Sequence, residues 1–357
     1  MSGASYAVVL AGGIGSRFWP VSTPERPKQL LPLVTERSLL EDTVARLEPL
    51  VGAERILILT SALLAPAIRS RMPHLAADQV LVEPRAAGTA AALAWASVEV
   101  RRRGGGAAAL VSVHADAAIG DDAAFRETLQ AALDVAVSAE SLCLVGIVPT
   151  EPHPGLGYIE PGAAVGAARK VSRFIEKPDR TTAAALVASG ALWNSGIFAW
   201  RCEDFLAEVR AHTPELADAL ATLEGGDDAA AAEMDAAAVR FFGAVHSTIS
   251  VDVGVLERSS RILVVPGQFG WSDVGTWGAL RDVRVRDAAG NAVHGTADHV
   301  EAENNVVNSS EGRVVLYGVQ DLVVVVQDGV TLVTTVAHSA ELKTLLDALP
   351  KRVVELR

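Results

Sequence analysis

Hydrophobic and polar positions along the first 150 residues follow two alternating patterns. Short runs rich in β-branched residues alternate with longer segments in which apolar residues recur at helical spacing. The predicted strands are 6–10, 55–60, 79–83, 108–113 and 142–148, and the predicted helices are 38–50, a segment ending at Met72, 89–103 and 123–138. This order predicts an α/β, Rossmann-like, mostly parallel sheet with helices on both faces.

The pattern changes after Pro149. Strands are predicted at 158–161, 170–178, 193–200 and 262–271, with helices between them and a surface helical pair at 217–238. After Asp287 the chain is β-rich through Thr335 and closes with an amphipathic helix at 339–349. We therefore expect a large domain, 1–287, with halves of about 1–150 and 151–287, and a small β-rich domain, 288–357, that ends in a helix.

Composition and charge narrow the classes of partner. The 357 residues carry a formal charge of −12, and Lys and Arg are scattered apart from 101–103, so we expect neither nucleic acid nor an anionic membrane as a partner. The two cysteines, Cys143 and Cys202, have no metal-ligand spacing and are expected to be buried in a protein of the reducing cytosol. The first residues lack a basic n-region, and no apolar run reaches roughly twenty residues, so we expect no signal peptide, no membrane helix and a cytoplasmic location.

A glycine turn directly follows the first predicted strand. It contains Leu10, Ala11, Gly12, Gly13, Gly15 and Ser16, and Arg17 comes next. Such a turn exposes backbone N–H groups and lets a phosphate or a base approach closely. A Walker A loop is excluded because no GKS or GKT follows, and Phe18 stands where the dinucleotide fingerprint needs its third glycine. The glycines alone would equally suit an ordinary strand-to-helix turn, but Arg17 and Lys28 could together hold a triphosphate.

Six motif segments then occur in order between about 8 and 280. They are LAGGIGSRFWPVSTPERPKQLLPL at 10–33, EP with GTA at 83–90, HAD at 114–116, GYI with FIEKP at 157–178, WNSGIF at 193–198 and GWSDVGTW at 270–277. This series resembles the nucleoside-diphosphate-sugar pyrophosphorylases, and its FWP and PKQ details are similar to the mannose-1-phosphate guanylyltransferase branch. The resemblance implies a glycosyltransferase-A-like nucleotidyltransferase fold. It also implies, more loosely through Asn291, Asn304 and Asn305, a β-helix-like C-terminal domain.

The nucleotide site is expected at the glycine turn and at the end of the third predicted strand. The resemblance adds Glu83, Pro84, Gly88 and Thr89 to the nucleotide-binding residues of the turn. Guanine presents two adjacent N–H donors that one carboxylate can accept together, whereas uracil and thymine do not, so Glu83 favours GTP. An exposed strand-end charge is the alternative reading of Glu83.

Two aspartates are the candidate metal ligands. The resemblance implies that Asp116 and Asp273 hold Mg²⁺, an ion that usually takes one or two carboxylates together with phosphate oxygens and water. The usual family pattern around the first aspartate is PAD followed by His, whereas this sequence has His114 and Ala117 at those places. We interpret His114 as a packing substitution rather than a catalytic residue.

The resemblance places the sugar phosphate in the second half of the large domain. It implies that Lys177 contacts the sugar's phosphate and that Glu176, Asn194 and the Gly157–Tyr158 segment bind its hydroxyls, with Asp252 a weaker candidate. Trp193, Trp200, Trp271 and Trp277 either line the sugar pocket or belong to the core, which is the commoner place for a tryptophan in a strand.

The expected reaction joins GTP to mannose 1-phosphate and gives GDP-mannose and pyrophosphate. Arg17, Lys28 and Lys177 are the expected catalytic residues, because positioning and charge neutralisation suffice when the attacking phosphate is already anionic. Two alternatives stay open: a guanylyltransferase for heptose or glucose 1-phosphate, and a non-catalytic GDP-mannose-binding paralogue with a regulatory role. Some relatives continue into a domain resembling a phosphomannose isomerase, and for this chain we expect the single activity. A homodimer is compatible with the sequence.

Overall fold

The computed structural model describes residues 3–13, 16–223 and 231–354, and these form two compact units. Unit 1 contains Met1–Gly12, Val44–His114 and Asp121–Phe269, and unit 2 contains Gly13–Thr43, Ala115–Gly120 and Gly270–Arg357. The chain passes repeatedly from one unit to the other. The division into domains near residue 287 stays a prediction.

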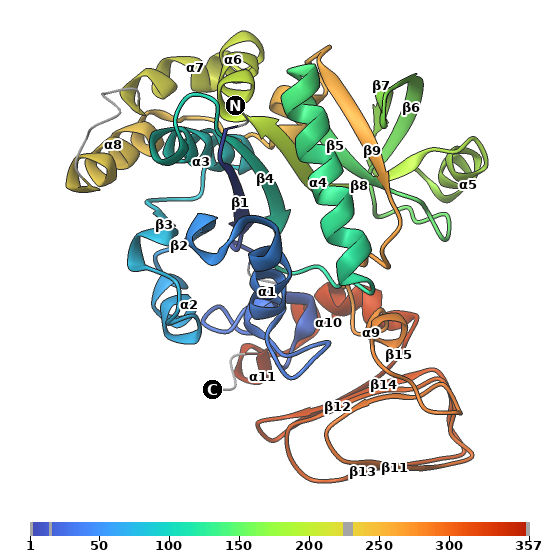
Figure 1. The fold of residues 1–357 in the computed structure, drawn as a ribbon. Coiled ribbons are helices and arrows are strands. Elements are labelled where there is room, and N and C mark those ends of the chain that lie inside the picture. Colours follow the sequence, from blue (N-terminus) through green and yellow to red (C-terminus); the bar gives the residue numbers. More distant parts are fainter. Residues whose placement is uncertain (1–2, 14–15, 224–230, 355–357) are drawn as a thin grey trace. The chain divides into compact units, whose positions relative to one another are not determined.

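Within its described residues, unit 1 is built on a nine-stranded sheet of order β3-β2-β1-β4-β8-β5-β9-β7-β6 (Figure 1). The strands are β1 Ser5–Leu10, β2 Ile56–Ser61, β3 Val80–Glu83, β4 Ala109–His114, β5 Leu142–Ile147, β6 Tyr158–Val165, β7 Ala168–Ile175, β8 Leu192–Arg201 and β9 Ile262–Gly267. The pairs within β3-β2-β1-β4 and the pair β5–β9 are parallel, as the sequence predicts. Strand β8 lies antiparallel to β4 and β5, and the β6–β7 hairpin is antiparallel too.

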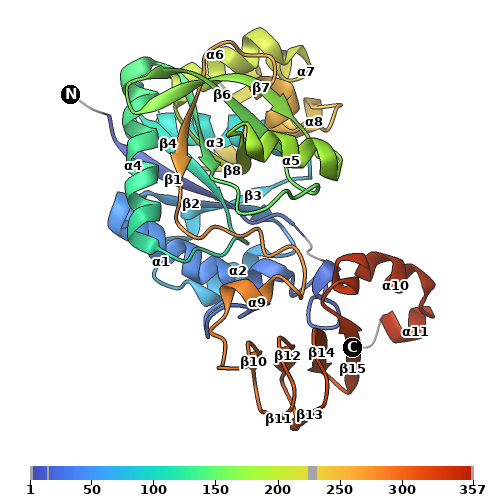
Figure 2. The same ribbon diagram turned by 90° about the vertical axis from the view of Figure 1, so that its right-hand side faces the viewer.

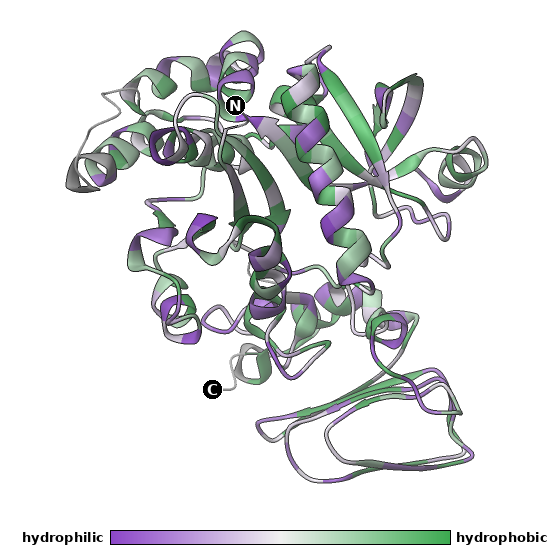
Figure 3. Ribbon diagram, in the orientation of Figure 1, coloured by the Kyte–Doolittle hydropathy of each residue, from purple (hydrophilic) through white to green (hydrophobic). Residues whose placement is uncertain are grey.

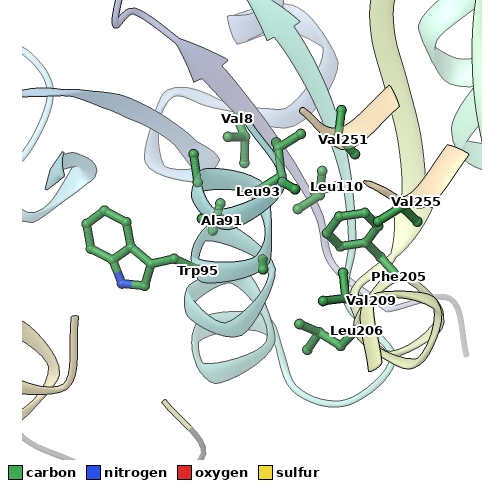
Figure 4. Close-up of a cluster of buried hydrophobic side chains, with 14 of the residues drawn as sticks. Val8, Ala91, Leu93, Trp95, Leu110, Phe205, Leu206, Val209, Val251 and Val255 are labelled. Atoms are coloured by element: carbon green, nitrogen blue, oxygen red, sulfur yellow. The ribbon is translucent and has the colours of Figure 1, made fainter. Parts of the chain in front are cut away.

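Helices cover both faces of this sheet, because its central strands carry apolar side chains on both sides. Residues Tyr6 and Val8 of β1 belong to the core under α3 (Thr89–Gly104), whereas the intervening Ala7 and Val9 are also fully buried and point to the opposite face. Figure 4 shows Val8, Leu93 and residues of α6 (Cys202–His212) in this core. Helices α7 (Pro214–Leu220) and α8 (Ala231–Ala244) add to the same core.

Helix α4 (Asp122–Ala139) covers the other face (Figures 1 and 2). It begins where the Asp121 carboxylate accepts hydrogen bonds from the N–H groups of Ala123 and Ala124. Hydrophilic and hydrophobic segments alternate along it (Figure 3), and Phe125 packs edge to face on Phe269, with ring centroids 5.2 Å apart. The amphipathic pattern of the sequence therefore describes this helix correctly.

The remaining helices are short apart from α1. They are α1 Leu39–Val51, α2 Ala65–Arg71, α5 Arg180–Ala188, α9 Leu280–Val283, α10 Leu342–Ala348 and α11 Lys351–Val354. Of the helical pair expected at 217–238, residues 224–230 lie outside the described residues. None of the helices in the described part of the chain combines the length and the apolar character needed to cross a membrane.

Both cysteines are fully buried in unit 1, as expected. Burial raises the pKa of the Cys143 thiol to about 12 and raises the pKa of Cys202 as well. Both side chains are therefore protonated, apolar core residues.

The C-terminal part of unit 2 is β-helix-like, as the sequence predicts. Strands β10 (Ala292–His294), β12 (Val306–Ser309) and β14 (Leu322–Gln327) pair in parallel, β15 (Val330–Thr335) closes this sheet antiparallel, and β11 (Ala297–Val300) pairs in parallel with β13 (Val314–Tyr317) (Figure 2). The buried Asn291 and Asn305 stack as a ladder, because Asn305 donates to Asn291 Oδ1 at 2.9 Å and accepts from the Leu322 N–H. Such side chains satisfy the backbone at each corner of the coil.

A buried arginine ties the N-terminal segment of unit 2 to its β-helix. The Arg284 guanidinium donates to the carbonyl of Leu33 at 2.6 Å, to the carbonyl of Val307 at 3.3 Å and to Asn308 Oδ1 at 2.8 Å. All three of these partners are neutral, and burial lowers the pKa of Arg284 to about 10. No feature of the sequence singled out this residue.

We predict that Arg284→Met destabilises the protein by roughly 2–4 kcal/mol, because buried acceptors lose their donors. Urea unfolding measures the difference. Arg281→Met is the control, since Arg281 makes a more exposed ion pair with Asp321 at 3.0 Å and should cost at most about 1 kcal/mol. Equal losses in the two variants would show that Arg284 contributes no more than a surface charge.

Candidate active site

Short segments that carry the two predicted metal ligands lie side by side in unit 2. Ala118 and Ser272 exchange two backbone hydrogen bonds of 2.9 and 3.0 Å, and the Gly120 N–H donates to the Gly270 carbonyl at 3.1 Å. A Cβ on Gly270 would lie 3.1 Å from Gly120 Cα, and its φ is +65°. The pairing brings the chain around Asp116 to the chain around Asp273.

Lys28 joins these segments through its side chain. It lies in a short 3-10 helix, Lys28–Leu30, and only 6% of it is exposed. Its ammonium donates to Asp116 Oδ2 at 3.0 Å and to the Asp273 carbonyl at 2.5 Å. Three residues that the sequence assigns to phosphate and metal chemistry are thus brought together, although they come from distant parts of the chain.

Asp273 begins a turn with an unusual backbone. Val274 has a φ of +44°, which β-branched residues rarely adopt, and its side chain is fully buried. Its N–H donates to Ser272 Oγ at 3.1 Å, and the Gly275 N–H donates to Asp273 Oδ1 at 3.2 Å. Backbone strain of this kind often accompanies functional sites, because the surrounding packing must enforce it.

The donor set suits a hard divalent cation. Asp116 and Asp273 offer carboxylate oxygens, and 42% of the Asp116 side chain is exposed, so it remains accessible. Within the described residues no group of three or more His, Cys, Asp or Glu side chains has metal-binding geometry. Two carboxylates completed by phosphate oxygens and water fit Mg²⁺ or a similar ion, whereas a structural zinc site would need more protein ligands.

The predicted phosphate-binding turn is only partly described. Arg17 lies exposed in the 3-10 helix Ser16–Phe18, and Gly15 lies outside the described residues. Gln29 Nε2 donates to the Gly13 carbonyl at 2.8 Å within unit 2. In unit 1 the other end of the turn continues the sheet, because the Ala11 N–H donates to the Leu59 carbonyl at 2.8 Å. Leu10, Ala11 and Gly12 therefore leave β1 in a fixed direction.

Glu83 ends β3 beside the glycine turn. A Cβ on Gly12 would lie 3.9 Å from Glu83 Oε1, so the carboxylate faces the backbone of the turn within unit 1. Burial raises the pKa of Glu83 to about 7. A half-buried carboxylate with a raised pKa differs from the exposed strand-end charge that was the alternative reading, and groups with perturbed pKa values cluster at functional sites.

Gly88 and Thr89 begin α3 under a tight constraint. Gly88 has a φ of +88°, and a Cβ there would lie 2.3 Å from the Ile249 carbonyl oxygen, so only glycine fits. Thr89 Oγ1 accepts a hydrogen bond of 2.9 Å from the Val251 N–H. Pro84 lies exposed between this segment and β3.

The predicted sugar-phosphate residues form a cluster in unit 1. The Asn194 N–H donates to the Gly157 carbonyl at 2.8 Å, and a Cβ on Gly157 would lie 2.7 Å from Glu176 Oε2. Asn194 Nδ2 donates to Asp252 Oδ1 at 2.8 Å. The weakest candidate in the sequence, Asp252, is thereby placed beside the others.

A β-bulge sets the direction of Asn194. The β5–β8 register shifts between Val145 and Gly146, and Gly196 has a φ of +71°. A Cβ on Gly196 would lie 2.8 Å from the His114 ring, so His114 packs on the bulge as interpreted from the sequence.

Of the other two predicted sugar-phosphate residues, Lys177 is exposed and Tyr158 is buried. The exposed Lys177 ammonium donates to Glu176 Oε1 at 2.7 Å, and its backbone has a φ of +43° immediately before Pro178. Tyr158 is fully buried, and its hydroxyl hydrogen-bonds to the backbone of His153, so only its main chain could face a ligand.

The tryptophans belong largely to the core. Trp200 and Trp277 are fully buried, and their indole N–H groups donate to Ser97 Oγ at 3.2 Å and to the Trp19 carbonyl at 3.0 Å. Trp193 is also buried, whereas Trp271 is half-buried. The contacts of Trp200 and Trp277 favour the interpretation of these tryptophans as core residues.

Sequence reasoning missed one acidic neighbour of the sugar cluster. Glu257 follows the π-helical turn Asp252–Leu256, and its pKa is raised by burial and by the negative charges of Asp252 and Glu176. Glu257 is five residues from Asp252, a spacing that neither an ordinary helix nor a strand places on one face. The irregular turn explains why the pattern gave no signal.

Comparison with known proteins identifies the family of this chain. The model of the nucleotidyl transferase family matches residues 6–290. Xanthan biosynthesis protein XanB of Xanthomonas campestris pv. campestris (strain B100) is 38% identical over 344 residues, which cover 91% of this chain and 69% of the relative. A mannose-1-phosphate guanylyltransferase of Escherichia coli (strain K12) is 35% identical over 328 residues, covering 90% of this chain and 68% of the relative.

A solved structure from Thermus thermophilus is similar over nearly the whole chain. It is described as a mannose-1-phosphate geranyltransferase, is 33% identical and superposes with a TM-score of 0.83, covering 98% of this chain and 100% of that one. This chain belongs to the nucleotidyl transferase family. It is an enzyme of nucleotide and sugar-phosphate substrates, in a family that generally uses a divalent metal.

We predict that the stability cost of Glu83 depends on pH. Its pKa is about 7 in the folded protein against 4.5 normally, so the folded state binds the extra proton and stability falls as pH rises from 4.5 through 7. Glu83→Gln should therefore raise Tm relative to the parent more at pH 8 than at pH 5. Glu127→Gln, on the exposed side of α4, is the control for removing one charge. Equal Tm differences at both pH values would contradict the raised pKa.

Proposed function

We propose that the protein is a mannose-1-phosphate guanylyltransferase, which makes GDP-mannose and pyrophosphate from GTP and mannose 1-phosphate. The observation that carries phosphate chemistry is the buried Lys28 ammonium on Asp116 and Asp273. The nucleotide and the sugar are suggested by relatives that bear this name at 33–35% identity. A cytoplasmic location remains a prediction from composition.

In the proposed reaction the sugar's phosphate oxygen attacks the α-phosphorus of GTP. A bond forms between these atoms, and the bond from the α-phosphorus to the oxygen of the β-phosphate breaks, so that pyrophosphate leaves with the electron pair. The attacking oxygen is already anionic at neutral pH, and no side chain has to remove a proton. The protein's contribution is to align the phosphates and to neutralise their charge.

Each cationic side chain is assigned to the phosphate groups of one substrate. We assign Lys28 and Arg17 of unit 2 to the triphosphate and Lys177 to the phosphate of the sugar. Asp116 and Asp273 would hold a divalent cation, which we propose to be Mg²⁺, and it would neutralise charge on the phosphate oxygens.

Base and sugar recognition are assigned to unit 1. Once ionised, Glu83 accepts the two adjacent N–H donors of guanine, while Leu10, Ala11, Gly12, Pro84, Gly88 and Thr89 contribute backbone and side-chain contacts to the nucleotide. Gly13, Gly15 and Ser16, which belong to unit 2, are assigned to the nucleotide as well. Glu176, Asn194, Asp252 and the Gly157–Tyr158 main chain face the sugar hydroxyls. The Asp252 carboxylate and the Gly196 N–H fix both ends of the Asn194 amide, so its orientation is set before a sugar binds.

The direct test is pyrophosphate release with Mg²⁺, in which mannose 1-phosphate is compared with glucose 1-phosphate and a heptose 1-phosphate, and GTP with ATP and UTP. We expect fast release only from GTP with mannose 1-phosphate. Release with another sugar phosphate instead would establish a different guanylyltransferase. No release with any pair, together with tight GDP-mannose binding, would establish the regulatory paralogue.

We predict that Asp116→Asn lowers kcat at least about 100-fold, because one of the cation's two carboxylates is lost. Its free energy of unfolding should stay within about 1–2 kcal/mol of the parent, since the asparagine amide oxygen can still accept the hydrogen bond from Lys28 and the side chain at 116 is partly exposed. Steady-state kinetics and urea unfolding measure the two effects. Asp218→Asn on α7 is the exposed control and should change neither. Unchanged kcat in Asp116→Asn would disprove the metal assignment.

Gly157→Ala tests the sugar cluster without removing a polar group. The new methyl would lie 2.7 Å from Glu176 Oε2 and would push that carboxylate aside. We predict a KM for mannose 1-phosphate raised at least about fivefold, with the KM for GTP within about twofold of the parent, as expected for lost ground-state contacts. Gly243→Ala is the matched control, because among the described residues no atom beyond its chain neighbours and the backbone of its own helix lies within 4 Å of the new methyl. Equal changes in both KM values would argue against a sugar-specific role.

A further inference from the structure

The buried ammonium of Lys28 uses the oxygens that are proposed for the metal. An ammonium has three N–H donors, and two of them reach Asp116 Oδ2 at 3.0 Å and the Asp273 carbonyl at 2.5 Å. Only 6% of Lys28 is exposed, and a buried charge without a partner is costly. The Asp116 carboxylate is therefore the anionic partner of this buried ammonium.

The main chain that carries Lys28 is held firmly. The Leu31 N–H donates to the Lys28 carbonyl at 3.0 Å, and the neighbouring Gln29 is buried, with its amide on the Gly13 carbonyl at 2.8 Å. Phe18 lies under the side chain, with its ring centroid 6.0 Å from Nζ. Any change of partner by Lys28 must come from rotation of its four-carbon side chain.

A divalent cation on Asp116 would meet this ammonium at close range. The ammonium and the cation would both lie next to the Asp116 carboxylate and would repel each other. In a partly buried site water screens this repulsion poorly. A triphosphate would relieve the conflict, because its oxygens are anionic acceptors for an ammonium. The conflict exists only while the nucleotide is absent.

We propose that Lys28 is the resident counter-cation of the metal site and makes cation binding depend on the nucleotide. In the free enzyme its ammonium holds the Asp116 carboxylate and competes with the divalent cation. When the nucleotide arrives, Lys28 turns to the phosphates and Asp116 becomes available, so nucleotide and cation favour each other's binding. This inference rests on the proposed role of Asp116 as a metal ligand.

Mn²⁺ binding to the nucleotide-free protein tests the competition, with the free ion measured by electron paramagnetic resonance. Removing the ammonium in Lys28→Gln should tighten Mn²⁺ binding at least about tenfold. An adjacent charge changes the proton affinity of a carboxylate by about tenfold or more, and we expect an effect of similar size on the cation. Lys28→Arg keeps the charge and should bind Mn²⁺ as weakly as the parent. Lys343→Gln removes an exposed lysine of α10 and is the control for net charge. Thermal unfolding of each variant verifies that it is folded.

The outcomes separate this inference from the proposed function. Lys28→Gln binding Mn²⁺ no more tightly than the parent, while Asp116→Asn abolishes binding, would overturn the competition and leave the metal role of Asp116 intact. Equal tightening in Lys28→Gln and Lys28→Arg would also overturn it, because the charge would then be irrelevant. Parent-like Mn²⁺ binding by Asp116→Asn would overturn the metal assignment itself and the inference with it.

Discussion

The charge of Lys28 is the constraint on which the chemistry of unit 2 depends. An ammonium that is almost completely buried must have an anionic partner, and Asp116 supplies it while the Asp273 carbonyl accepts a second N–H. The pairing of Ala118 with Ser272 holds the two segments at the distance that one lysine can span. In a protein with a formal charge of −12, a buried lysine is thus held between two segments that each carry an aspartate.

In unit 1 the candidate binding residues are positioned by glycines and by irregular backbone. Gly88 and Gly196 have positive φ and leave no room for a Cβ, while Gly157 leaves space that the Glu176 carboxylate fills. The bulge in β8 turns Asn194 out of the regular pleat and toward Asp252. Strained residues and tight glycines cost stability, and the large core under α3 compensates for them. The candidate sugar-binding residues of unit 1 are thus positioned mainly by strands and by the bulge in β8.

Much of the architecture was predictable from the sequence, because strands buried on both faces and amphipathic helices leave clear local patterns. The antiparallel insertion of β8 between β4 and β5 was not, since strand partners depend on distant segments. The residue types of the site could be predicted from motifs. The burial of Lys28 could not, because its partner Asp116 lies 88 positions away. Arg284 and Glu257 could not be identified from the sequence for the same reason, because their roles come from contacts that no local spacing encodes.

In the proposed mechanism these side chains align and neutralise phosphates, and no residue forms a covalent bond to the guanylyl group. The stereochemistry at the α-phosphorus tests this claim most directly, with a GTP whose α-phosphate carries sulfur in one defined configuration and mannose 1-phosphate as acceptor. A single in-line displacement predicts a GDP-mannose thiophosphate with inverted configuration. Retained configuration would require two successive displacements through a guanylylated side chain, and it would contradict the account.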